Sequence, residues 1–428
     1  MAGFMATVPR NPEPSVAVAT EPAKAAGPGD GGAFSSLRNG NFRLLVGGSL
    51  ASGFAMWMES IGQGWLVHEL TSSPFQLGFV QFLRGISILF VSPVVGALAD
   101  RVDQKKLAGF ATALNGLNAL TVGILVVTGR VEIWHLYVTS FIGGTAGSVY
   151  NPVRQHLVYR SVGPESLTNA IALNAGANNV SRVVAPNVSG AMIGFFGVES
   201  SFFAESLFFG AAVISLFSMK LQPVAVRSTE SVLTSVRLGV AHLRAHPLLW
   251  RLVLLQAVPT FLVYPYLQLM PSMAADYLHV GAQGFGFLQT GVGFGSILMT
   301  LIVAQFASVR HKGPIMSLAL MAYMSMILAF SFSRIFMLSF GLLMLGGMNL
   351  IVFTTFNQSL LQLNVEDEYR ARVISLFTMV QGLNPLGSLV MGSVAEVLGT
   401  PHAIALMTGL AILAALVAGV GSPHVRRL

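Results

Sequence analysis

Long apolar runs separated by short polar segments dominate the 428-residue chain. A helix needs about 20 consecutive apolar residues to cross the hydrocarbon core of a bilayer, so each run predicts one spanning helix. The runs form two sets of six, which predicts an all-α membrane protein with twelve transmembrane helices in two six-helix bundles. The predicted spans are 42–69, 76–99, 107–128, 133–152, 169–197 and 200–220 in the first set, and 248–272, 283–307, 314–332, 335–357, 371–397 and 401–421 in the second.

The segments outside the two sets have a different composition. Residues 1–36 are rich in Ala, Pro and Gly and contain no continuous apolar run, which is typical of a disordered tail. Between the sets, apolar side chains from Val232 to Leu243 recur every three or four residues, which predicts a helix lying on the membrane surface. The predicted divisions are a cytoplasmic tail over 1–36, an N-terminal bundle over 37–220, a cytoplasmic linker over 221–247, a C-terminal bundle over 248–422 and a second cytoplasmic tail over 423–428.

The positions of lysine and arginine predict the orientation, because positive residues are retained on the cytoplasmic side. Twenty of the 24 basic residues fall on one side of the predicted spans, Arg130 and Arg334 fall on the other, and Arg84 and Arg182 lie within spans. Both termini are therefore predicted to be cytoplasmic. For a bacterial protein, which we expect, the location is the inner (plasma) membrane, where the chain is a multi-pass protein.

The two sets are related in sequence when the chain is compared with itself at a displacement of 203 residues. Duplicated halves usually enclose a substrate site near the middle of the bilayer, and rocking of one half against the other opens it to each side in turn. The repeat therefore favours alternating access over a channel. The matched pairs include Gly143 with Gly346, Gly144 with Gly347, Gln155 with Gln358 and Ile171 with Ile374.

Composition excludes several other classes of protein. The chain is 54% hydrophobic and 10% charged, whereas soluble domains carry about 25% charged residues. Its net charge of +7 is not gathered on one basic face, so a nucleic-acid partner is not expected. The chain has no cysteine, no metal-ligand spacing, no phosphate-cradling loop and no nucleophile motif. We therefore expect no enzyme activity, no cofactor and no bound metal.

A short motif stands between the second and third predicted spans. Residues 96–107 have the sequence GALADRVDQKKL, which resembles the loop signature G-x-L-x-D-R-x-G-R-K of the major facilitator superfamily. Asp103 and Gln104 replace the usual glycine and arginine, and this variant is similar to the branch that contains enterobactin exporters and bacterial multidrug efflux pumps. The resemblance covers 38–220 and, more faintly, 248–420. It implies the fold of that superfamily and secondary active transport.

The resemblance also implies a conformational latch on the cytoplasmic side. Gly96 allows a neighbouring helix to approach closely, and Asp100 faces a helix N-terminus of the other half. Arg101 is expected to pair with Glu368 or Asp367 of the other half, and Lys105 belongs to the same group. These contacts would form in one transport state and break in the other. The alternative is that the basic residues only set the orientation of the loop.

The fifth predicted span contains a second partial motif. Its sequence from Arg182 to Gly190 is similar to the G-P-x-x-G-G signature of exporters, with Pro186 and Gly190 matching and with Ala185 and Ser189 in place of glycines. Small residues there permit close packing against the opposing half. The motif favours export over import, and ordinary helix packing is the alternative.

Ionisable residues inside spans are costly in hydrocarbon and therefore point to function. Glu59 is the only acid that we expect well inside a span. Glu59 and Arg84 both lie about 12–15 Å from the outer ends of their predicted spans, at 1.5 Å per residue. The two are predicted to pair between adjacent helices, with Arg182 nearby, and to carry proton coupling. The alternative is a permanent structural ion pair.

Uncharged polar residues within the spans predict a substrate cavity. Prolines at 259, 265 and 271 predict a bent or broken seventh span, a common feature beside transport sites. With 29 Phe and 19 Met in the chain, the predicted cavity is large, adaptable and mostly apolar. The residues assigned to it are Gln63, Asn174, Asn178, Gln256, Thr260, Tyr264, Asn349, Gln381 and Asn384.

The leading functional hypothesis is a proton-coupled antiporter that exports an amphipathic small molecule, either a drug-like compound or a siderophore, by alternating access. Its expected partners are the substrate, the coupling proton and the lipid bilayer, and it is expected to act as a monomer. One alternative is an importer or facilitator of a nutrient or metabolite on the same fold. Another is a membrane protein without transport activity, such as a lipid scramblase or a receptor.

Overall fold

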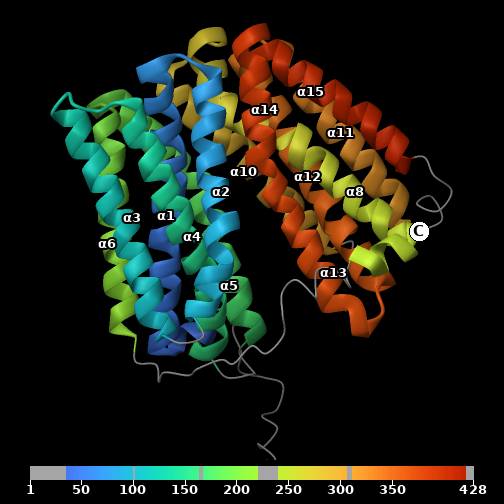
Figure 1. The fold of residues 1–428 in the computed structure, drawn as a ribbon, viewed down its shortest axis with the longest axis horizontal. Helices are drawn as coiled ribbons and strands as arrows, with labels where there is room; N and C mark the ends of the chain where they lie inside the picture. The colour runs from blue at the N-terminus through green and yellow to red at the C-terminus, as the bar shows by residue number, and fades with distance from the viewer. Residues whose placement is uncertain (1–34, 100–101, 163–166, 220–239, 306–310, 421–428) are drawn as a thin grey trace, which may run out of the picture.

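The computed structural model of the chain describes residues 35–99, 102–162, 167–219, 240–305 and 311–420. These residues form two bundles that stand side by side (Figure 1). Each bundle has six helical rods, and a rod is one helix or a run of consecutive helices. The N-terminal bundle contains α1 (Gly40–Thr71), α2 (Pro74–Ala99), α3 (Gln104–Val127), α4 (Ile133–Ser161), α5 (Leu167–Phe196) and α6 (Val198–Ser218). The C-terminal bundle contains α8 (Pro247–Leu262), α10 (Gly281–Gln305), α11 (Lys312–Phe332), α12 (Phe336–Asn364), α13 (Asp367–Met379) with α14 (Leu383–Leu398), and α15 (Thr400–Ala415).

Length and apolar content agree with an all-helical membrane protein. Within the described ranges, nine of the rods are long and apolar enough to cross a membrane. The other three rods are α2, α4 and α5. The α4 and α12 helices continue to Ser161 and Asn364, beyond the predicted ends at 152 and 357. The predicted spans are otherwise close to the observed helices.

The seventh span is broken, as its prolines predict. The α8 helix contains Pro259 and ends at Leu262, and the rod continues as the 3-10 helix Tyr264–Leu269, the short α9 (Met270–Ser272) and the π-helical turn Met273–Tyr277. Each proline lacks a backbone N–H and so interrupts the regular hydrogen-bond ladder.

Equivalent turns join the last two rods of each half. Gly197 between α5 and α6 has a φ of 89°, and Gly399 between α14 and α15 has a φ of 81°. Side chains with a Cβ rarely adopt this backbone region, which explains glycine at both positions. The shared turn is a structural counterpart of the repeat in the sequence.

The two bundles pack closely where α5 meets α10 and where α2 meets α14. A Cβ added at Gly190 would lie 2.7 Å from the carbonyl oxygen of Ala282 and 3.2 Å from the Cα atom of Gly286. A Cβ added at Gly78 would lie 3.2 Å from the Cα atom of Gly392. The predicted close packing of the fifth span against the opposing half is therefore confirmed.

Polar contacts also join the bundles at the ends that the basic residues assign to the outside. His68 Nε2 lies 3.3 Å from Asp276 Oδ1. Ser73 Oγ donates to Glu396 Oε2 at 2.7 Å. The bundles lie close together at the top of Figure 1, near the labels of α10 and α14, and diverge toward α5 and α13 at the bottom. With the predicted orientation, this conformation is closed on the outer side.

Three of the predicted divisions, the two tails and the linker, fall largely outside the described residues. Most of the 1–36 tail, the 423–428 tail and residues 220–239 are not described. Ser35 and Ser36, which the prediction included in this tail, begin the 3-10 helix Ser35–Arg38. In the linker, residues 240–245 are helical, and Leu243 is buried in the core of the C-terminal bundle. This part of the predicted surface helix therefore packs into the bundle.

Candidate functional site

Glu59 of α1 and Arg84 of α2 form a two-pronged ion pair inside the N-terminal bundle. Arg84 Nη1 donates to Glu59 Oε1 at 2.6 Å, and Arg84 Nη2 donates to Glu59 Oε2 at 2.9 Å. The Glu59 residue is only 6% exposed. The contact that the depth of the two residues predicted is therefore present, and both carboxylate oxygens are occupied by the guanidinium group.

Glycines of α4 make room for this pair. A Cβ added at Gly143 would lie 3.2 Å from Glu59 Oε1, and one added at Gly144 would collide with the carbonyl oxygen of Arg84. Near the same place, the side-chain amide of Gln63 donates to Ser140 Oγ at 2.7 Å. The ion pair is thus surrounded by packed helices within one bundle.

Glu205 is a second buried acid in this bundle. The prediction that Glu59 is the only acid well inside a span is therefore wrong. Glu205 lies on α6, is 3% exposed, and its Oε2 atom has no hydrogen-bond partner among the described residues. Glu205 stands five residues after position 200, the predicted start of the sixth span. Its side chain is buried because α6 packs along α1 and α3.

Arg182 lies apart from the Glu59–Arg84 pair, at the contact between the bundles. Its Nη2 atom donates to Ser296 Oγ of α10 at 3.2 Å, and its Cζ atom lies 5.9 Å from the ring centroid of Trp57. Within the described ranges no carboxylate forms an ion pair with Arg182. The predicted grouping of Arg182 with the ion pair is therefore not seen in this conformation.

Two residues assigned to the substrate cavity lie within the interior of the C-terminal bundle. Gln256 is 1% exposed and Thr260 is fully buried. Gln256 Nε2 donates to Thr260 Oγ1 at 3.4 Å, and Asn357 Nδ2 donates to Gln256 Oε1 at 3.4 Å. A spacing of four residues places side chains on one helix face but does not say which neighbour that face meets. Here the face meets α12.

The other predicted cavity residues do not converge on one point. Asn178 accepts from Arg154 Nη1 at 3.1 Å and donates to the carbonyl of Asn174 at 2.7 Å. The Tyr264 ring packs edge-on against the ring of Tyr323. Asn349 donates to the carbonyl of Leu345, and the backbone carbonyl of Asn384 accepts from Ser388. Gln381 is exposed.

The latch residues are only partly described. Asp100 and Arg101 lie outside the described residues, and neither the surroundings of Gly96 nor the side chain of Glu368 is described. Lys105 Nζ donates to the carbonyl oxygen of Phe217 at 2.9 Å, at the end of α6. In this conformation Lys105 therefore contacts its own bundle, and its part in a latch stays a prediction.

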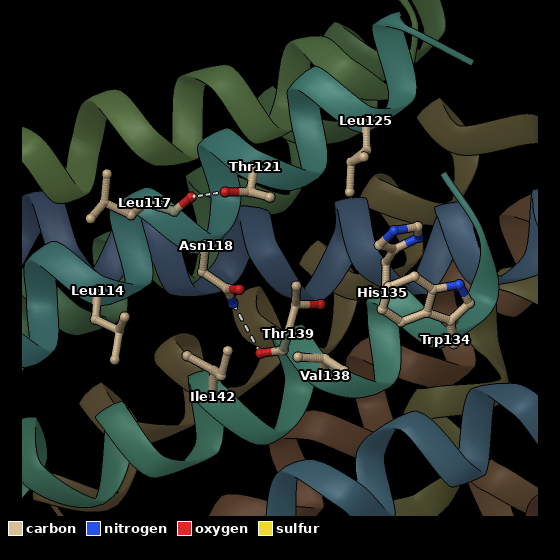
Figure 2. Close-up of a pocket in the computed structure, with 10 residues that line it drawn as sticks. All are labelled: Leu114, Leu117, Asn118, Thr121, Leu125, Trp134, His135, Val138, Thr139 and Ile142. Atoms are coloured by element: carbon tan, nitrogen blue, oxygen red, sulfur yellow. Dashed lines mark hydrogen bonds between the residues drawn. The ribbon is translucent and has the colours of Figure 1, made fainter. Parts of the chain in front are cut away.

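A mostly apolar groove of about 250 Å³ runs between α3 and α4 (Figure 2). Asn118 of α3 donates to the carbonyl of Thr139 across it at 2.9 Å. The Asn118 amide nitrogen also lies 4.0 Å from a Cβ added at Gly143. The atom nearest to that Cβ is Oε1 of Glu59. Asn118 therefore stands between the groove and the ion pair. The lining residues are Leu114, Leu117, Asn118, Thr121, Leu125, Trp134, His135, Val138, Thr139 and Ile142.

Comparison with solved structures identifies the fold. The fold is similar to that of the nucleoside transporter NupG, with a TM-score of 0.72 at 14% identity, covering 88% of this chain and 98% of that one. This likeness shows the fold of the major facilitator superfamily. In the described part of the chain, no three His, Cys, Asp or Glu residues lie close enough to hold a metal ion.

Sequence comparison identifies the family. The chain belongs to the transmembrane secretion effector family of major facilitator superfamily transporters, which it matches over residues 31–425. It is 22% identical over 352 residues to the staphyloferrin A transporter of Staphylococcus aureus, covering 82% of this chain and 88% of the relative. It is 21% identical over 358 residues to macrolide efflux protein A of Streptococcus pyogenes, covering 82% and 88%. It is 24% identical over 349 residues to the enterobactin exporter of Shigella flexneri, covering 81% and 83%.

Proposed function

We propose that this transporter exports an amphipathic small molecule, a drug-like compound or a siderophore, in exchange for protons and by alternating access. The observation that carries the proposal is the buried Glu59–Arg84 ion pair inside the N-terminal bundle. The names of the related siderophore and macrolide transporters support the direction and the kind of substrate.

A buried ion pair is a suitable proton switch because its two states differ greatly in energy. While Glu59 is ionised, it neutralises Arg84, and the bundle interior carries no net charge at this point. A change of one proton at this site leaves an uncompensated charge, which is costly in a medium of low dielectric constant. That state therefore favours a conformation in which the charge gains a new partner or water, and proton exchange shifts the conformational equilibrium.

Arg182 marks the region where a substrate would be recognised. It joins α5 to α10, one helix from each bundle, and it lies over the indole ring of Trp57. A cation beside aromatic rings suits a substrate with both a polar and an apolar part. Both helices belong to the surfaces that separate during alternating access, so a substrate bound there would be exposed to each side in turn.

Transport in proteoliposomes tests the proposal. Staphyloferrin A, enterobactin and a macrolide serve as probes, with and without a pH gradient. We expect gradient-driven movement of at least one probe by the wild type, loss of the gradient effect in Glu59→Gln, and wild-type behaviour in Glu69→Gln. Glu69 is a suitable control because it is an exposed acid of the same helix, and its carboxylate bonds to Trp65. Gradient-driven transport by Glu59→Gln equal to that of the wild type would refute the assignment.

The same vesicles separate the alternatives. Accumulation of a probe in the direction opposite to export would indicate an importer, and equilibration without accumulation would indicate a facilitator. Lipid movement between leaflets without any ion gradient would indicate a scramblase. Probes that bind without crossing the membrane would indicate a receptor.

A further inference from the structure

Glu205 is an acid in the interior of the N-terminal bundle that the ion pair does not use. Its exposed fraction is 3%, and its Oε2 atom lacks a hydrogen-bond partner in the described part of the chain. One turn earlier on α6, the hydroxyl of Ser201 lies 3.1 Å from a Cβ added at Gly62 of α1 and bonds to Ser189 of α5 at 2.6 Å. Residues four apart share a helix face. Glu205 is therefore on the face of α6 that packs against α1 and α5.

The charges around Glu205 do not balance if both acids are ionised. Gly48 of α1 meets Ser215 of α6 and Gly62 meets Ser201, so the two helices run antiparallel and Glu205 lies level with Glu59. The two Nη atoms of Arg84 are already bonded to the two oxygens of Glu59. One guanidinium group thus faces two carboxyl groups, and ionisation of both would leave a net negative charge in a dry interior.

Among the described residues, no other charged side chain is placed to supply the missing positive charge. The nearby side chains of α3 are the amides of Asn115 and Asn118, which lie close to Glu59. The remaining charged or titratable groups of α6 and of the helices packed against it lie toward helix ends or face the other bundle: Glu199 on α6, Arg43, His68 and Glu69 on α1, Lys105 and Lys106 on α3, and Arg182 on α5.

We propose that Glu205 holds the exchanged proton, an inference that rests on the proposed proton-coupled function. While the bundle is dry and Arg84 is bonded to Glu59, the Glu205 carboxyl is protonated and the cluster is neutral. A conformation that admits water to the cluster stabilises the extra negative charge, and Glu205 then gives its proton to that water. In each cycle one proton passes from outer water to the Glu205 carboxylate, and the same proton passes from the carboxyl group to cytoplasmic water.

The hydrogen bonds distinguish the two acids. Both oxygens of Glu59 accept from Arg84, at 2.6 and 2.9 Å, whereas Oε2 of Glu205 accepts from no group that the structure describes. The charged form of a carboxyl group is favoured where it receives charged donors, and the neutral form where it does not. Glu59 is therefore the ionised partner of Arg84, and Glu205 is the acid that binds and releases the proton.

Infrared spectroscopy of the full-length protein in lipid bilayers tests the proposal without a substrate. A protonated buried carboxyl group has a carbonyl-stretch band that shifts in heavy water. We expect this band at neutral pH in the wild type and in Glu199→Gln, a control acid in the first turn of the same helix. We expect its loss in Glu205→Gln. A band that persists in Glu205→Gln, or that is absent from the wild type, overturns the proposal.

A second variant tests the sharing of Arg84 and does not depend on the folding of Glu205→Gln. In Glu59→Gln the guanidinium of Arg84 is free to neutralise Glu205, so the band of the protonated carboxyl group should disappear even though Glu205 is present. A purely structural buried acid would keep its proton and its band, and that result overturns the proposal.

The failure of this proposal and the failure of the proposed function are distinguishable. A wild type that transports with a pH gradient but lacks the band retains the proposed function and refutes the role of Glu205. A wild type that shows the band but no gradient-driven transport of the three probes refutes proton exchange itself, and the role of Glu205 with it.

Discussion

The glycine pairs of α4 and α12 occupy equivalent places in the two bundles and meet similar backbone surroundings. A Cβ added at Gly144 would collide with a carbonyl oxygen of α2, and one added at Gly347 would collide with a carbonyl oxygen of α10. The hydroxyl groups of Ser87 and Ser296 lie beside the same two glycines. The repeat has therefore kept a close helix contact in both halves.

The side chains around the preceding glycines differ between the halves. A Cβ added at Gly143 would lie 3.2 Å from the carboxylate of Glu59, whereas one added at Gly346 would lie 3.4 Å from the methyl group of Ile327 and 3.8 Å from the ring of Tyr323. The same backbone frame thus surrounds charged groups in the N-terminal bundle and uncharged groups in the C-terminal bundle. Under the proposed proton exchange, this difference would place the response to protons in the N-terminal bundle.

The largest expected effect comes from removing the charge of Arg84. Arg84→Gln leaves the buried Glu59 and Glu205 without a cation, and loss of one partner of a buried ion pair costs about 3–5 kcal/mol. In the C-terminal bundle, Asn357→Leu removes neutral hydrogen bonds, each worth about 1 kcal/mol. Chemical unfolding in mixed micelles measures both. Equal losses of stability would contradict the contrast between the two interiors.

The next effect tests the shared backbone frame. Gly144→Ala and Gly347→Ala place a Cβ against a backbone carbonyl, and overpacking of this kind costs about 1–3 kcal/mol. Gly147→Ala on α4 is the control because a Cβ added there has no heavy atom within 4 Å among the described residues. Thermal unfolding should show similar losses for the first two variants and none for the third. Tolerance of alanine at only one of the first two positions would break the equivalence of the halves.

The smallest expected effect concerns the outer contact between the bundles. Asp276→Asn weakens the contact with His68 by about 0.5–1 kcal/mol, which shifts the balance toward the outward-open state about twofold to fivefold. Because the chain has no native cysteine, spin labels on cysteines introduced at Ser72 and His279 report the distance between the outer ends.

Glu69→Gln is the control for this measurement, because Glu69 bonds to Trp65 of its own helix. Its distance distribution should match that of the wild type. A distribution for Asp276→Asn that is also unchanged would show that the His68–Asp276 contact does not hold the outer side closed.

Much of the architecture followed from the sequence because bilayer thickness dictates the length of apolar runs. The breaks at Pro259, Pro265 and Pro271 were predictable for a similar reason, since each removes a backbone donor. The Glu59–Arg84 contact was also predictable, because a short turn joins α1 to α2 and therefore sets the two residues at equal depth.

The remainder depended on which faces of the helices meet, and apolar spans carry little information about this. Glu205 was overlooked because its burial arises from the packing of α6 against α1 and α3, which the periodicity of an almost wholly apolar helix does not reveal. Gln256 and Thr260 were placed in a cavity because they share a face, but that face meets α12. Arg182 was grouped with the ion pair because it is an ionisable residue within a span, although its guanidinium group bonds to Ser296 of α10.

The most direct test of proton-driven export is to record proton movement while substrate moves. Vesicles loaded with a probe and a pH-sensitive dye should show proton entry as the probe leaves, in the wild type and in the Glu69→Gln and Glu199→Gln controls. Glu59→Gln and Glu205→Gln should release the probe, if at all, without moving protons. Probe release by the wild type with no proton movement, or unchanged proton movement in both variants, would contradict the account.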